Sequence, residues 1–161
     1  MKISEENEGL SVMTFQDRNT VVSILVNLSM LTYVVIRLIN MQAAGQFDGP
    51  DAVNVWARMV VWVIPLSIAA TIIGTILFNI IFAIVTGQEK PSFVVDERDK
   101  HFERRGSFAV IAGAGIGFVT GIVAMALDYS ALVGLNIMYF GMAAGALGSD
   151  LVRFASYRRG Y

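Results

Sequence analysis

The sequence predicts an all-α membrane protein: a four-transmembrane-helix bundle of two antiparallel hairpins, with both termini in the cytosol. Composition is the first observation, because 55% of the 161 residues are apolar, 16% are charged and the mean hydropathy is +0.62. An ordinary soluble domain is less apolar than this. Second, the chain has four apolar stretches, each close to or longer than the ~20 residues that cross a ~30 Å hydrocarbon layer. Third, Lys and Arg are concentrated on one side of these stretches.

Composition also argues against several classes of function. The net charge of -1 argues against nucleic-acid binding, because neutralising phosphates requires a surplus of basic residues. The chain has no cysteine for a disulfide or a thiolate metal site, and its single histidine cannot supply a pair of haem ligands. Nucleophile–base pairs and phosphate- or zinc-binding motifs are also missing, so we expect no catalytic site, no metal and no cofactor.

The first half of the chain is predicted to form a cytosolic tail and one hairpin. Residues 1–19 are polar and acidic, and lack the basic and apolar regions of a signal peptide. We expect them to form a tail or a short interfacial helix. Spans follow at about 20–40 and about 59–86; the second would be roughly 42 Å long, which exceeds the hydrocarbon layer. It must therefore tilt, kink or project, and Pro65 is where we expect a kink.

The second half is predicted to form the other hairpin. A charged cytosolic segment at 88–106 precedes spans at about 107–127 and about 131–148, which a short turn connects. Residues 149–161 then form a basic and aromatic cytosolic tail. We expect the charged segment to be an interfacial helix that bends into the third span at Gly106.

The distribution of basic residues predicts the orientation. Ten of the 12 Lys and Arg residues lie in the two terminal regions and the charged segment, and only Arg37 and Arg58 lie on the opposite side. Positive residues favour the cytosolic side, so both termini should be cytosolic. Arg37 and Arg58 themselves either snorkel and pair with nearby acidic residues or form a small anion-attracting patch.

Rows of small residues follow the last two spans at a spacing of four. Such rows let helix backbones approach closely, which gives contacts that lipid cannot match. They predict either packing within the second hairpin or an interface with another copy or partner. The residues are Gly113, Gly117, Gly121, Gly141 and Gly145.

A polar stripe follows the second span, also at a spacing of four. Its residues are Ser67, Thr71, Thr75 and Asn79. Such side chains in membrane helices commonly bond to carbonyls of their own helix. The alternative is that the stripe lines a hydrated path, with Asn27, Ser29, Thr32 and Asn136 opposite.

The charged segment is the main candidate for a functional surface. Nine of the twelve residues in Val95–Gly106 are charged or histidine. We interpret it as a partner-docking hinge formed by Asp96, Glu97, Arg98, Asp99 and Glu103. The simpler interpretation is a solvated helix laced with ion pairs between residues one turn apart. Glu97 and His101 alone supply too few ligands for a metal site, which needs three or four.

Basic residues at the cytosolic face are expected to contact anionic lipids. Each adds about 1 kcal/mol of attraction to such a surface. The residues are Arg104, Arg105, Arg153, Arg158 and Arg159.

The motif Asp96-Glu97-Arg98-Asp99, followed by a mixed-charge helix leading into an apolar span, resembles a family of small prokaryotic multi-spanning membrane proteins of unknown function. The ending Tyr157-Arg158-Arg159-Gly160 resembles how those proteins end. The resemblance covers about the second half of the chain, whereas the dense glycines of the third span are not typical of the family. It implies a prokaryotic inner membrane and no catalytic residues, and some members are encoded beside small helix-turn-helix regulators.

Two functions remain open from the sequence. The first is a non-catalytic accessory subunit or regulator that docks a protein partner through the charged segment. The alternative is a small homodimeric channel or transporter, with the Ser67–Asn79 stripe lining its path.

Overall fold

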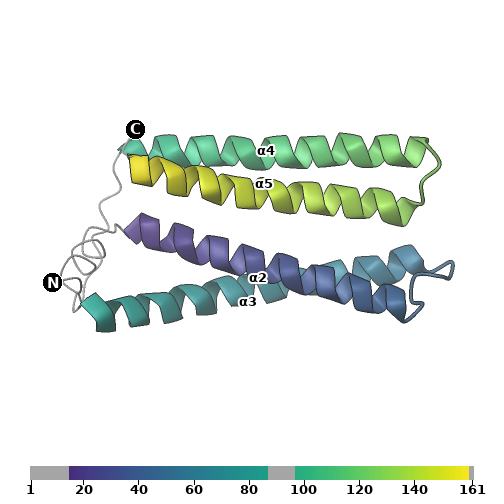
Figure 1. The fold of residues 1–161 in the computed structure, drawn as a ribbon, viewed down its shortest axis with the longest axis horizontal. Helices are drawn as coiled ribbons and strands as arrows, with labels where there is room; N and C mark the ends of the chain where they lie inside the picture. The colour runs from purple at the N-terminus through teal and green to yellow at the C-terminus, as the bar shows by residue number, and fades with distance from the viewer. Residues whose placement is uncertain (1–14, 87–96, 160–161) are drawn as a thin grey trace.

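The protein is all-helical, as its computed structural model shows (Figure 1). The structure describes residues 15–86 and 97–159, and at 15–18, 86, 97–102 and 157–159 it describes the backbone alone. The described residues form the four helices α2 (Phe15–Ala43), α3 (Ala52–Thr86), α4 (Glu97–Ala126) and α5 (Ala131–Arg159). All four are long and apolar enough to cross a membrane.

Helix α5 connects the bundle. It packs most extensively against α4, contacts α2 to a smaller extent and touches α3 at a few positions. Helices α2 and α3 also contact each other, whereas α4 contacts only α5 among the described helices. Figure 1 shows α4 and α5 side by side along their whole length, and α2 crossing α3.

Both described turns are closed by backbone hydrogen bonds at a residue in the left-handed conformation. At the end of α2, Gly45 has φ +68, and the amide of Gln46 donates to the Met41 carbonyl oxygen at 3.0 Å. After α4, Asp128 has φ 64, and the Tyr129 amide donates to the Ala124 carbonyl oxygen at 3.1 Å. These bonds satisfy helix-end carbonyls and reverse the chain, and glycine and aspartate are among the residues that adopt this conformation most readily.

Glycines bring α4 and α5 into backbone contact. A Cβ atom built on Gly113 would lie 2.5 Å from the Cα of Gly145, and one on Gly117 would lie 2.8 Å from the Cα of Gly141. A Cβ on Gly121 would lie 2.7 Å from the carbonyl oxygen of Gly134. No side chain fits at these distances, so the two helices approach this closely because glycine occupies both faces.

The first two helices pack less tightly. At Gly74 of α3, an added Cβ would meet only the side chains of Val26 and Val22 of α2, at 3.1 Å and 3.4 Å. Val34 is fully buried, but only 6% of the apolar part of α3 is buried. Most of α3 therefore faces whatever surrounds the described helices, which in a membrane is lipid or another protein.

All four helices extend beyond the predicted spans. Helix α3 begins at Ala52 and runs through Pro65, and α5 continues to Arg159, well beyond residue 148. The bend expected at Gly106 is wrong, because α4 runs as one straight helix from Glu97 (Figure 1). Gly106 is buried against α5, where an added Cβ would lie 2.8 Å from the Ser149 Oγ, so it serves packing and not bending.

Substituting a glycine of the α4–α5 contact should destabilise the protein. We expect Gly113→Ala to lower the free energy of unfolding by about 1–3 kcal/mol, the usual cost of overpacking, because the methyl group meets backbone atoms that cannot rotate away. Thermal unfolding of the detergent-purified protein, followed by circular dichroism, measures the change.

Gly115 provides a matched control on the same helix. A Cβ at Gly115 would have nothing within 4 Å. Gly115→Ala should therefore leave stability unchanged or raise it slightly, since alanine favours a helix by up to about 1 kcal/mol. Equal losses of stability in Gly113→Ala and Gly115→Ala would contradict the close contact.

The two tryptophans should differ in their access to lipid. Trp56 is 9% exposed, and its indole Nε1 donates to the Asn136 Oδ1 at 2.9 Å, whereas Trp62 is 76% exposed. Brominated lipid should therefore quench the fluorescence of Trp56→Phe, which retains Trp62, much more than that of Trp62→Phe. Equal quenching of the two variants would contradict this packing.

Candidate functional site

A buried carboxylate joins the last helix to the first. Asp150 of α5 is 5% exposed, and its Oδ2 accepts two hydrogen bonds from α2. The Ser23 Oγ donates at 2.8 Å and the Asn27 Nδ2 donates at 2.7 Å. A buried charge needs such partners, because desolvating an unpaired carboxylate is very costly. Asp150 therefore fixes how α5 lies against α2.

Two other polar residues, Ser149 and Arg153, lie within three residues of Asp150 on α5. Ser149 is 3% exposed, and the Nε of Arg153 is buried and has no hydrogen-bond partner among the described residues. Gly106 of α4 makes room for these side chains, since a Cβ there would lie 2.6 Å from the Arg153 Nε. We call Ser23, Asn27, Ser149, Asp150 and Arg153 the polar cluster.

The polar cluster was missed from the sequence. Asp150 lies beyond the apolar run that ends near residue 148, so it was assigned to a cytosolic tail. Helix α5 continues past it, which carries Asp150 into the bundle. Two features of the sequence could have indicated it. Ser23 and Asn27 are four residues apart and so share one face of α2, and a single acidic residue follows the row of small residues on α5.

The chemistry of the polar cluster suits a structural role, which is to hold α5 against α2 by hydrogen bonds. It offers a single carboxylate, and no group of three or more His, Cys, Asp or Glu residues exists in the described part of the chain to hold a metal ion. A second hydrogen bond between helices lies near the other end of α5, where Asn136 accepts from Trp56 of α3 at 2.9 Å. The Trp56 ring also packs edge-on against Tyr139, with ring centroids 6.4 Å apart.

The polar stripe of α3 bonds to its own helix. The Ser67 Oγ donates to the Ile64 carbonyl oxygen at 2.7 Å, and the Thr71 Oγ1 donates to the Ser67 carbonyl oxygen at 2.8 Å. The Asn79 Nδ2 donates to the Thr75 carbonyl oxygen at 2.8 Å. These bonds use the hydroxyl hydrogens of Ser67 and Thr71 and one amide hydrogen of Asn79 within α3.

The residues suggested to face this stripe lie elsewhere. Asn27 belongs to the polar cluster and Asn136 bonds to Trp56. Ser29 and Thr32 are exposed, and each donates at 2.8 Å to the carbonyl oxygen four residues earlier in α2. The described residues therefore do not bring these side chains together around a path.

The charged segment is described in part. Asp96 lies outside the described residues, and the structure gives only helical backbone for Glu97, Arg98 and Asp99. Glu103 is exposed on the same helix, α4.

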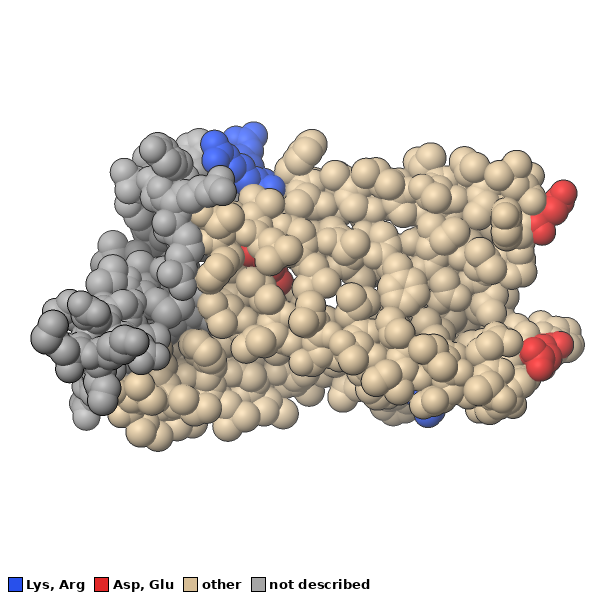
Figure 2. All heavy atoms as spheres, viewed as in Figure 1, with Lys and Arg blue, Asp and Glu red and all other residues tan. Residues whose placement is uncertain are grey.

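The basic residues predicted to contact lipid lie at the start of α4 and the end of α5. Arg104 and Arg105 are exposed, Arg153 is partly buried in the polar cluster, and Arg158 and Arg159 are helical. Figure 2 shows a group of basic atoms at this end of the molecule and acidic atoms at the opposite end, with further acidic atoms visible between the helices and a basic atom at the lower edge.

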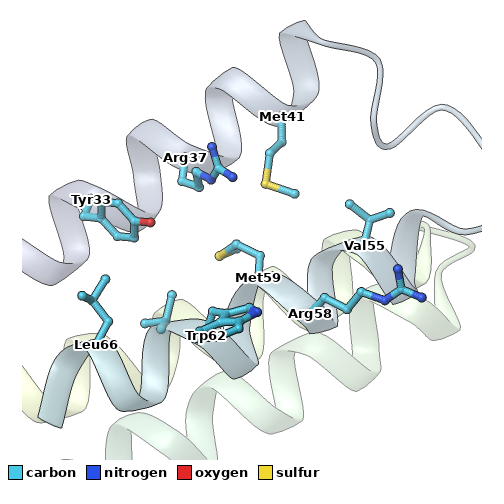
Figure 3. Close-up of a pocket in the computed structure, with 9 residues that line it drawn as sticks. Tyr33, Arg37, Met41, Val55, Arg58, Met59, Trp62 and Leu66 are labelled. Carbon is cyan, nitrogen blue, oxygen red and sulfur yellow. The ribbon is translucent and has the colours of Figure 1, made fainter. Parts of the chain in front are cut away.

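A cavity of about 480 Å³ opens between α2 and α3. Arg37 of α2 and Arg58 of α3 both line it, with Tyr33 and Trp62 beside them (Figure 3). Arg37 and Arg58 are both exposed, and neither forms an ion pair with another described residue. The pairing expected between these arginines and nearby acidic residues is therefore not seen among the described residues.

A search of family models, of curated proteins and of solved structures finds no match to this chain. The resemblance carried by Asp96-Glu97-Arg98-Asp99 therefore stays a prediction.

Removing the Asp150 carboxylate should destabilise the protein. Asp150→Ala leaves the Ser23 hydroxyl and the Asn27 amide without their acceptor, which costs about 1–3 kcal/mol per buried group. We expect a lower midpoint of thermal unfolding, and Asn27→Ala combined with Asp150→Ala should cost less than the sum of the single changes. Ser29→Ala, which removes an exposed bond within α2, is the control and should change stability little. Additive effects of Asn27→Ala and Asp150→Ala would contradict the hydrogen bond between these two side chains.

Proposed function

We propose that this protein is a non-catalytic integral membrane protein that acts through contacts, as an accessory subunit or regulator. Its charged segment, with Asp96, Glu97, Arg98, Asp99 and Glu103, docks a protein partner. It resides in the cytoplasmic membrane of a prokaryote, as the resemblance of Asp96-Glu97-Arg98-Asp99 implies.

The orientation in this proposal places both termini and the charged segment in the cytosol. The four helices then form two antiparallel hairpins, with the turns at 44–51 and 127–130 on the opposite side. Support comes from the bias of ten against two in Lys and Arg. The described turns carry Asp48, Asp51 and Asp128 and no basic residue.

One observation carries the docking proposal: α4 is a single helix from Glu97 to Ala126. Its apolar span begins at about Glu103, so the preceding residues continue the same helix as a charged extension. Glu103, Arg104 and Arg105 are exposed there and form no ion pair with another described residue. The sequence of this extension carries charges of both signs, which suits a partner with complementary charges that would fix register and orientation on binding.

The channel alternative has less support. A conducting path needs polar groups that face water, yet Ser67, Thr71 and Asn79 donate to carbonyls of α3. This leaves contact with a partner as the function that we favour.

Reversing the charges of the extension should abolish partner binding. We expect the wild-type protein, extracted gently from its own membrane, to carry a second polypeptide that native mass spectrometry detects as a defined excess mass. Asp96→Lys, Arg98→Glu and Asp99→Lys together should remove that excess mass, because like charges then oppose each other across the interface.

Asp48→Lys is the matched control, because it changes the net charge by the same amount on the turn after α2. It should retain the partner. An unchanged yield of partner with the triple variant would overturn the docking proposal. A bare homodimer of the wild-type protein would favour the channel, and flux assays with Thr71→Val and Thr75→Val would follow.

A further inference from the structure

The cavity between α2 and α3 contains two cationic side chains without counter-charges. Asp48 and Asp51, the nearest acidic residues along the chain, lie at the turn after α2. The Asp48 carboxylate lies over Gly45, with its Oδ2 3.0 Å from where a Cβ would stand, and the Asp51 Oδ1 accepts from the Asn54 Nδ2 at 3.5 Å. Neither forms an ion pair with Arg37 or Arg58, so these two guanidinium groups are open to an external anion.

The length of the helices places this charge at the edge of the hydrocarbon layer. Helix α3 has 35 residues and is about 52 Å long, so about 11 Å would project on each side of a ~30 Å layer centred on it. Arg58 lies six residues from the start of α3 and Arg37 six residues from the end of α2, each about 9 Å inward. Both guanidinium groups therefore reach the level where lipid phosphates meet the acyl chains.

The walls of the cavity suit the rest of a lipid. Met59, Val63 and Leu66 line it on the deeper side, and Trp62 adds the kind of amphipathic ring that favours the membrane interface. Figure 3 shows the Arg58 side chain extending along α3 toward the start of the helix, with Leu66 at the opposite end of the cavity. Apolar side chains line the cavity on both sides of the two arginines, with Met41 and Val55 toward the turn and Val63 and Leu66 farther from it.

We propose that this cavity binds an anionic phospholipid from the leaflet that faces the turn at 44–51. Its phosphate contacts the guanidinium groups of Arg37 and Arg58, which favour phosphate because their planar donors match two oxygens at once. One acyl chain lies against Val63 and Leu66. This site is separate from the basic residues at the opposite end of the bundle, and it does not depend on the docking of a partner.

The test uses the purified protein in vesicles that contain a trace of phosphatidylglycerol or phosphatidylcholine with a photoreactive diazirine in the acyl chain. After irradiation, peptide mass spectrometry locates the adducts. We expect phosphatidylglycerol adducts on the Met59–Leu66 stretch, and a loss of roughly tenfold in Arg37→Gln/Arg58→Gln, since each basic residue contributes attraction to anionic lipid. Arg104→Gln/Arg105→Gln removes the same charge at the other end and should leave these adducts unchanged.

Three results would overturn the proposal. Equal labelling of Met59–Leu66 by phosphatidylcholine would show that the cavity does not select anionic lipid. Unchanged labelling in Arg37→Gln/Arg58→Gln would show that the arginines are not the ligands. Loss of labelling when inorganic phosphate is added would identify a free anion as the occupant. If the double variant fails to fold, the comparison of the two lipid probes with the wild-type protein decides alone.

Discussion

Close approach of backbones holds the second half of the protein together. In a membrane the hydrophobic effect does not favour one helix pair over another, because lipid is as apolar as a leucine side chain, so association depends on van der Waals contact and polar bonds. The pairs Gly113–Gly145 and Gly117–Gly141 provide the first of these, with distances that exclude a Cβ atom. Among the described helices, α4 contacts only α5, so the position of α4 depends on these glycine contacts.

Polar bonds then attach that helix pair to the first two helices. Asp150 near the end of α5 accepts from Ser23 and Asn27 of α2, and Asn136 near its start accepts from Trp56 of α3. Hydrogen bonds are directional, so bonds at opposite ends of α5 fix both the rotation of this helix and its position along the bundle. Apolar contacts alone would fix this less well, because α3 touches α5 at few positions.

Much of the fold could be predicted from the sequence, because helix length and apolar composition are local properties. The small residues of α4 and α5 also pointed to close packing, although the choice between contacts within and between chains needed coordinates. The polar cluster could not be predicted, since it depends on how far α5 continues and which face of α2 it meets. Asp150 looked like a tail residue because apolar composition fades before the helix ends.

Among the described helices, α5 alone contacts both α4 and the first two helices. Gly106 of α4 lies against Ser149 and Arg153, the neighbours of Asp150, and Asp150 is bonded to α2. A displacement of α4 near Gly106 would therefore reach the part of α5 that carries Asp150, the residue bonded to α2. By contrast, the cavity between α2 and α3 lies toward the turn at 44–51, away from this junction, where the helices pack loosely. The closest backbone packing thus lies between α4 and α5, and the cavity lined by Arg37 and Arg58 lies between the more loosely packed α2 and α3.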